Sequence, residues 1–152
     1  MDAQHVDPNT IAVWRWHAAL TASVLALPLI GFALRAPSAS WMLLPIAYVA
    51  IAAYCIWVLP SAHYEALKFS VDDHGISIER GIFWRSRIAL PRIRVQHSDV
   101  SQGPLQRRFG VATLKLYTAG SRFTKIELPG LTHDDALALR DALIARGGDS
   151  GV

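Results

Sequence analysis

The sequence contains a single cysteine, Cys55, so an intramolecular disulfide framework is excluded. Net charge is also small, at +3 over 152 residues, and does not by itself select a nucleic acid or a membrane as partner. Hydrophobic residues make up 52% of the chain, and this content excludes an intrinsically disordered protein. The length leaves room for one or two small domains and excludes a large multidomain enzyme.

Charged residues are nearly absent from the first 62 residues, which contain only Asp2, Asp7, Arg15 and Arg35. The other 23 charged residues lie in residues 63–152 and make up 26% of that stretch, close to the value of about 25% for soluble domains. The chain therefore combines an apolar N-terminal region with a soluble C-terminal region.

Arg35 divides the apolar region into two spans, residues 16–34 and 41–60, joined by a small polar turn over residues 35–40. Each span has about 20 residues, which as a helix covers the roughly 30 Å hydrocarbon thickness of a bilayer. A helix also satisfies its own backbone hydrogen bonds in lipid. We therefore expect a transmembrane helical hairpin over residues 16–60.

An N-terminal tail, residues 1–15, precedes the predicted hairpin. Two other interpretations of the apolar region are a pair of buried core helices and a cleaved signal peptide. Neither span has a polar face, which disfavours core helices of a soluble protein. The tail carries two aspartates and the first span is long for a signal peptide, which disfavours cleavage.

Aromatic residues with a polar N–H or O–H stand near the ends of the spans, as is typical of residues at the headgroup region. These predicted interface anchors are Trp14, Trp16, Trp41, Trp57 and Tyr64. The turn between the spans carries Arg35 alone, whereas Arg15, Lys68 and the later arginines lie on the other side. This bias predicts that both termini are cytoplasmic.

Pro28 and Pro45 are expected inside the two helices, where each removes a backbone hydrogen bond and can kink the helix. A kinked hairpin is compatible with a transport pathway. Transport sites usually contain intramembrane ionisable residues, and here only His17 stands at the edge of a span. The spans are therefore interpreted as an anchor, with transport as the alternative.

Alternating apolar and polar residues in the soluble region predict six or seven antiparallel strands. The six clearest cover residues 67–72, 76–79, 84–90, 93–100, 112–117 and 123–128. Trp84, Ile88 and Leu90 are expected on one face of their strand. Val100 is out of phase with Ile93 and Val95, which indicates a β-bulge, and residues 101–110 form a loop or a partial helical turn.

A C-terminal amphipathic helix is predicted to end at Arg146. Thr132 and Asp135 form a capping box at its start. Its apolar arc contains Ala136, Leu137, Leu139, Leu143 and Ile144. We expect a mainly-β, partly open barrel over residues 64–146, capped by this helix, and a flexible tail over residues 147–152.

The stretch from Arg94 to Ser121 resembles the bacterial pleckstrin-homology (PH-like) family, also called the membrane-flanked domain. The residues of the shared motifs are Gln96, His97, Gln102, Gly103, Pro104, Leu105, Arg108, Phe109, Gly110, Thr118, Ala119 and Gly120. Ser98 departs from the pattern, where an apolar residue such as valine is expected. The resemblance implies a PH-like fold and a multi-pass protein of the bacterial inner (plasma) membrane, and it supplies no reaction.

Seven arginines and one aspartate, Asp99, lie between residues 80 and 108. The arginines are Arg80, Arg85, Arg87, Arg92, Arg94, Arg107 and Arg108. Strand alternation predicts that Arg85, Arg87, Arg92 and Arg94 lie on polar faces of neighbouring strands. One hypothesis is a surface for anionic phospholipid, since each basic residue near an acidic leaflet contributes about 1 kcal/mol. A solvated basic face with internal ion pairs is the alternative.

His97 and Asp99 lie two residues apart and can share a strand face, but no third ligand is spaced nearby, so we expect no metal site. No nucleophile motif or phosphate-binding glycine loop is present. We therefore expect neither catalysis nor a cofactor. A nucleic-acid site needs a basic patch with exposed aromatic residues, for which Trp84 and Tyr117 are candidates, but membrane tethering disfavours it, so we expect no nucleic-acid partner.

The sequence thus predicts a non-enzymatic membrane protein with a cytoplasmic PH-like interaction module held at the bilayer. Its expected partner is a membrane protein, a second copy of itself or anionic lipid. The alternative is a subunit of a membrane transport or envelope-resistance complex, and an enzyme is a more distant one.

Overall fold

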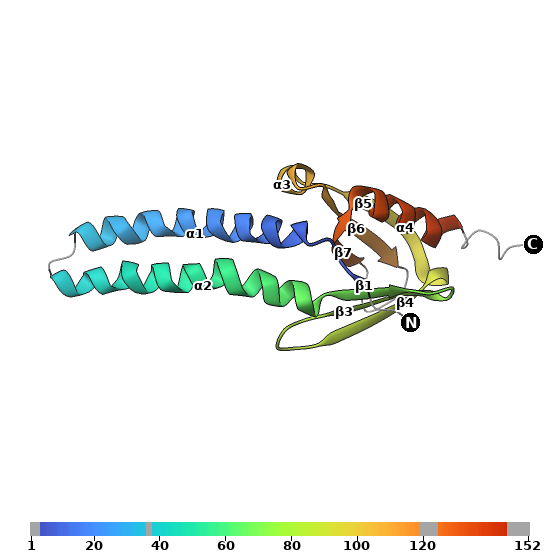
Figure 1. The fold of residues 1–152 in the computed structure, drawn as a ribbon, viewed down its shortest axis with the longest axis horizontal. Helices are drawn as coiled ribbons and strands as arrows, with labels where there is room; N and C mark the ends of the chain where they lie inside the picture. The colour runs from blue at the N-terminus through green and yellow to red at the C-terminus, as the bar shows by residue number, and fades with distance from the viewer. Residues whose placement is uncertain (1–3, 36–37, 119–124, 146–152) are drawn as a thin grey trace, which may run out of the picture.

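The computed structural model describes residues 4–35, 38–118 and 125–145, and it places a long helical hairpin on one end of a β domain (Figure 1). The hairpin consists of α1 (Asn9–Arg35), the short 3-10 helix η1 (Ala39–Met42) and α2 (Leu43–Ala66). The helical segments Asn9–Arg35 and Ser40–Ala66 are long and apolar enough to cross a membrane.

The helices of the hairpin extend past the apolar spans toward the domain. At 27 residues, α1 is about 40 Å long, which exceeds a hydrocarbon core of about 30 Å. Its first turn is stabilised by Asp7, whose Oδ1 accepts a hydrogen bond from the Asn9 N–H (2.7 Å). Between the helices, the Tyr48 hydroxyl donates to the Ala22 carbonyl (2.6 Å).

The prolines differ in part from expectation. Pro28 lies inside α1 as predicted. Pro45 is the third residue of α2, where a backbone N–H has no partner within the helix, so the predicted interior position is wrong. Pro60 instead lies inside α2, because the helix continues to Ala66.

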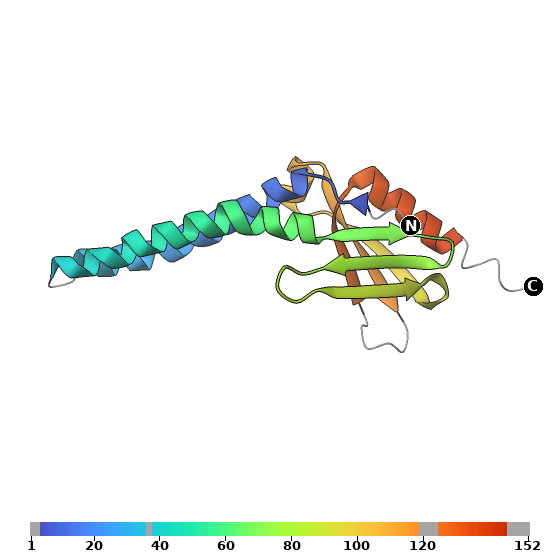
Figure 2. The same ribbon diagram turned by 60° about the horizontal axis from the view of Figure 1, so that its bottom comes forward.

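Two antiparallel sheets and one long helix form the domain, which confirms the predicted fold class (Figure 2). The first sheet has the order β1 (Gln4–His5), β2 (Lys68–Val71), β3 (Gly75–Arg80) and β4 (Ser86–Pro91). The second has the order β5 (Val95–Ser101), β6 (Val111–Thr118) and β7 (Lys125–Thr132). The 3-10 helix η2 (Arg92–Arg94) joins the sheets, α3 (Pro104–Arg108) joins β5 to β6, and α4 (His133–Ala145) ends the domain.

The core lies between the two sheets and α4. Apolar residues of the strands alternate into it, as the period of two requires. The buried side chains include Ile76, Ile78, Ile88, Leu90, Leu114, Leu116, Ile126, Leu128, Ala136 and Leu143. In α4, Ile144 is 50% exposed, so it does not belong to the buried arc that the sequence predicted.

The N-terminal segment is part of the domain, which corrects its description as a tail. Gln4 pairs with Phe69 at the edge of β2, and Val6 is buried in the core. The Asp7 N–H donates to the Gly130 carbonyl (2.7 Å). This pairing joins residues more than 60 positions apart, so local sequence patterns carry no signal for it.

The connection between the sheets reverses the predicted faces of two residues. The three residues of η2 break the alternation, so Arg92 is buried and Ile93 is 86% exposed. Trp84 precedes β4 and is 91% exposed, so its predicted place on the inner face beside Ile88 is wrong. The predicted bulge is confirmed by the register shift between Val95 and His97.

Candidate functional site

The strand register shows which end of the domain faces the hairpin. Only Leu67 separates α2 from β2, so Lys68 lies directly at the base of the helix. Lys68 pairs with Glu79, and the β3–β4 ladder ends at Arg80 and Ser86. We call this the hairpin end of the domain. The far end contains Pro91, the last residue of β4.

A cleft of about 560 Å³ opens at the hairpin end, between the last turns of α2 and the β3–β4 hairpin. It brings four cationic side chains together with two carboxylates. Its lining residues are Ala62, Glu65, Ala66, Lys68, Glu79, Arg80, Gly81, Ile82, Arg85, Ser86 and Arg87. The formal charge of the lining is therefore +2.

Ion pairing uses only part of this positive charge. Arg87 and Glu79 face each other across β3 and β4, with Nη2 2.5 Å from Oε1. Arg80 and Arg85 form no ion pair in the part of the chain that the structure describes. Their guanidinium groups are exposed and able to bind a phosphate with two parallel hydrogen bonds.

The loop between β3 and β4 is shaped by Gly81. Its φ is +110°, and a Cβ atom at this position would stand 2.0 Å from the carbonyl oxygen of Trp84. Only glycine accepts this conformation without strain. The turn leaves Phe83 and Trp84 at the tip, 87% and 91% exposed.

A second basic group lies on α3, beside the N-terminal end of α1. Arg107 and Arg108 are both exposed there. The helix is held by Gln106, whose Oε1 accepts from the Gly103 N–H (2.9 Å) and whose Nε2 donates to Thr113 Oγ1 (2.9 Å). This places the two arginines at the hairpin end, on the opposite side from the cleft.

The remaining two arginines lie at the far end. Arg92 is 8% exposed and donates from Nη2 to the Asp72 carbonyl (2.8 Å), so it holds the β2–β3 turn. Arg94 is exposed at the end of η2. The seven predicted arginines therefore do not form one face. Three line the cleft, two lie on α3, and two lie away from the hairpin.

The residues that carry the resemblance to the PH-like family shape the backbone around α3. Gln102 Nε2 donates to the Val111 carbonyl (3.0 Å), and Pro104 begins α3. Leu105 and Phe109 are half-buried on α3 and at its end, and Gly110 has φ +72°.

The other motif residues lie on the β5–β6 pair. Gln96 is at the bulge, the His97 ring lies 5.8 Å from that of Tyr117, and Thr118 is buried. Ala119 and Gly120 lie outside the described residues. In the described parts of the chain, no group of three His, Cys, Asp or Glu side chains is placed to hold a metal ion.

Three of the predicted interface anchors make contacts at the domain side of the hairpin. The Tyr64 hydroxyl donates to the Val6 carbonyl (3.0 Å), and Trp14 meets His63 edge-on. Trp57 lies under the Arg15 guanidinium, 4.8 Å from its ring centroid.

The two other predicted anchors, Trp16 and Trp41, lie elsewhere on the hairpin. Trp16 is 53% exposed on α1. Trp41 packs edge-on against Phe32 at the opposite tip of the hairpin.

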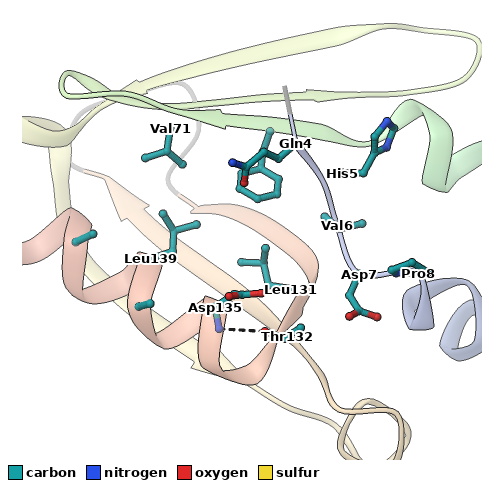
Figure 3. Close-up of a pocket in the computed structure, with 13 residues that line it drawn as sticks. Gln4, His5, Val6, Asp7, Pro8, Val71, Leu131, Thr132, Asp135 and Leu139 are labelled. Carbon is teal, nitrogen blue, oxygen red and sulfur yellow. Dashed lines mark hydrogen bonds between the residues drawn. The ribbon is translucent and has the colours of Figure 1, made fainter. Parts of the chain in front are cut away.

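A second groove, of about 530 Å³, lies between the N-terminal segment, β2 and α4 (Figure 3). Val71 and Leu139 face each other across it, and the Asp135 N–H donates to Thr132 Oγ1 (3.1 Å) at its edge. No local sequence pattern predicts this groove, because it depends on the pairing of β1 with β2. The Asp7 carboxylate and the Thr132 hydroxyl are engaged in hydrogen bonds at helix starts. The lining contains no lysine or arginine, and Asp7 and Asp135 give it a formal charge of −2 with His5 neutral, so it does not suit an anionic headgroup.

The ion pair between Lys125 and Glu127 lies on β7, outside the cleft (2.6 Å). Their hydrogen bond raises the pKa of Lys125 and lowers the pKa of Glu127. Both charged forms are thereby favoured, which leaves these two residues engaged with each other.

Sequence reasoning missed Lys68, Phe83 and the role of Gly81. The signal was present in the run ERGIFWRSR, where a glycine and two aromatic residues stand between arginines. Alternation placed Trp84 inside a strand because Ile88 and Leu90 continue the same phase.

Comparison with known proteins places these features in a family. The profile described as "Bacterial PH domain" matches residues 22–147. The chain is 30% identical over 154 residues to the UPF0699 transmembrane protein YdbS of Bacillus subtilis (strain 168), covering 97% of this chain and 95% of that protein. No solved structure matches the chain significantly.

Proposed function

Because the chain belongs to the bacterial PH domain family and is a membrane protein, we propose that its domain is a non-enzymatic module that binds anionic phospholipid headgroups at the cytoplasmic surface of the inner membrane. The hairpin anchors the module. The ligand is the phosphate-bearing headgroup of a lipid such as phosphatidylglycerol.

The observation that carries this proposal is the position of Arg80 and Arg85 in the cleft beside the end of α2. A helix that leaves the bilayer brings this cleft to the headgroup layer. A charged lipid then lies within the Debye length of about 8 Å, so salt screens its attraction only in part. Each basic residue contributes about 1 kcal/mol near an acidic leaflet.

Tethering makes a weak site sufficient. The single residue Leu67 links α2 to β2, so the cleft cannot move far from the membrane. The effective lipid concentration at the cleft is therefore high, and occupancy needs no deep pocket.

The distribution of basic residues supports a cytoplasmic position of the domain. Arg15, Lys68, Arg80 and Arg85 are on the domain side of the hairpin, and Arg35 is the single basic residue in the turn at its other end. Positive flanking residues are retained in the cytoplasm.

The test uses the full-length protein in phosphatidylcholine liposomes with trace spin-labelled phosphatidylglycerol or phosphatidylcholine. Electron spin resonance gives the relative association of each lipid with the protein. We expect the wild type to prefer phosphatidylglycerol and to lose this preference at high salt. Arg85→Gln should lower the preference by up to about fivefold, while Arg94→Gln, an equal charge change at the far end, should leave it unchanged.

Equal association of both lipids with the wild type at low salt would contradict lipid binding. In that case, affinity purification in detergent decides between the other expectations. Recovery of a stoichiometric membrane-protein partner would make the domain a protein-binding module, and self-association would make the partner a second copy.

A further inference from the structure

Phe83 and Trp84 are the two most exposed large hydrophobic side chains that the structure describes, at 87% and 91%. They are adjacent and form the tip of the β3–β4 loop. Exposed apolar patches on soluble surfaces commonly mark sites of protein or membrane interaction. Their position in the molecule identifies which of these surfaces they meet.

The tip lies beside the final turns of α2 and points back along the hairpin, in both views (Figures 1 and 2). The neighbouring loop residues Gly81 and Ile82 line the cleft together with Ala62 of α2. Ala62 is five residues beyond Trp57, or about 7.5 Å along the helix. Trp57 is a predicted interface residue, so the loop stands at the depth of the headgroup layer.

The chemistry of the tip fits the same layer. Trp combines a large apolar ring with an N–H donor, and such rings collect at the membrane interface. Arg80 and Arg85 flank the aromatic pair and remain available to phosphates. An apolar wedge between basic residues is the composition of segments that lie in the interfacial plane.

We propose that Phe83 and Trp84 insert into the interfacial region of the bilayer beside α2 and attach the domain to the membrane at a third point. The other two points are the connections of the domain to α1 and α2. This inference rests on the proposed function only in placing the hairpin end of the domain against the bilayer. Insertion itself requires no anionic lipid.

The geometry of the loop suits a fixed wedge. Gly81 closes the turn against the Trp84 carbonyl, and the β3–β4 ladder continues up to Arg80 and Ser86. The aromatic pair is therefore presented on a short, supported tip. Little further ordering is needed on contact with lipid, which favours binding.

The experiment places a fluorophore at the tip of the full-length protein in nanodiscs. Trp84→Cys and the control Ile93→Cys are each labelled in a Cys55→Ala background. Ile93 is a matched control because it is 86% exposed and lies at the far end. Nitroxide-bearing lipid is included in nanodiscs of phosphatidylcholine, with and without phosphatidylglycerol.

We expect strong quenching of the label at position 84 in both lipid mixtures and none at position 93. No quenching at position 84, or equal quenching at both positions, would overturn the insertion. If phosphatidylglycerol preference is absent while quenching at 84 is present, the proposed function fails and the insertion stands. The reverse result removes the insertion and leaves the proposed function.

A second measurement tests insertion without a label, because the fluorophore itself can perturb the loop. In phosphatidylcholine nanodiscs, the unlabelled wild type should resist trypsin cleavage after Arg85. The Phe83→Ser/Trp84→Ser variant should be cleaved there, while cleavage after Arg94 should be equal in both proteins. Equal cleavage of both proteins after Arg85 would contradict insertion.

Discussion

Ser98 places a hydroxyl inside β5, where the side chain is 7% exposed and Oγ has no hydrogen-bond partner among the described residues. Burying a hydroxyl without a partner costs roughly 1–3 kcal/mol in proteins. The position is also the one at which the family resemblance leads us to expect an apolar residue. Ser98 therefore makes the fold less stable than an apolar residue at this position would.

Ser98→Val should raise the free energy of unfolding by about 1 kcal/mol, because it removes the unpaired hydroxyl and adds buried apolar surface. Chemical denaturation of the full-length protein in detergent measures the change. Ser98→Ala separates the two causes, since it removes the hydroxyl without adding volume. A destabilised Ala variant would mean that the hydroxyl has a stabilising contact.

At Gly130, both the backbone conformation and the space around the residue exclude a larger side chain. Its φ is +88°, and an added Cβ would lie 2.4 Å from Thr10 Oγ1 on α1. Gly130→Ala should destabilise the fold by about 2–4 kcal/mol, from the left-handed backbone and the overlap together. The thermal midpoint reports this loss. Gly31→Ala is the control, because no described atom beyond its own stretch of helix lies within 4 Å of the added Cβ. An equal loss in both variants would refute the explanation.

Single helices and strands depend on a few defined contacts at their ends. The Asp135 N–H donates to Thr132 Oγ1 at the start of α4, as the predicted capping box requires. Thr132→Ala should cost about 1 kcal/mol, measured by denaturation. Thr132→Ser retains the oxygen and should recover most of the loss. If Ser is as unstable as Ala, the contribution comes from the Thr methyl group.

The two-residue strand β1 depends on Val6, which is 3% exposed just after it. Val6→Asp should detach the segment, since a buried carboxylate is far more costly than an exposed strand edge. Hydrogen exchange should then become faster in residues 4–10. Gln4→Asp adds the same charge at an exposed position and should leave exchange beyond the substituted residue close to that of the wild type.

Elements differed in how far the sequence predicted them. The hairpin was predicted because apolar length is a local property. The elements β3, β6 and α4 were predicted because their apolar residues recur with the period of a strand or a helix. The 3-10 helix η2 at residues 92–94 was not predicted, because such a short turn interrupts the period of two without a signal of its own. The cleft depends on β3 and β4 returning to the base of α2, so its residues come together through tertiary contacts that no local pattern encodes.

At the scale of the whole molecule, the two ends of the apolar region meet. Arg15 Nη2 donates to Ser61 Oγ (3.2 Å), so the points where the chain leaves and re-enters the domain are adjacent. The segment before Arg15 supplies β1, Val6 and Thr10 to the domain. The soluble fold is therefore assembled from both sides of the hairpin.

A soluble variant should consequently need both parts. Residues 1–15 joined by a short Gly/Ser linker to residues 61–152 should be monomeric and show a cooperative thermal transition. The fragment 64–152 alone should aggregate or melt at a lower temperature, because the edge of β2 and the core beneath Val6 are uncovered. Equal melting temperatures would show that the N-terminal segment contributes little to stability.

The double connection between hairpin and domain also has a mechanical consequence. One residue, Leu67, joins α2 to β2, while the Asp7–Gly130 backbone hydrogen bond and Thr10 fix the start of α1 to β7. These two connections prevent the domain from rotating independently of the hairpin. When the helices tilt to match a thinner or thicker bilayer, the first sheet must turn with them. A change in bilayer thickness therefore changes the orientation of the domain relative to the membrane.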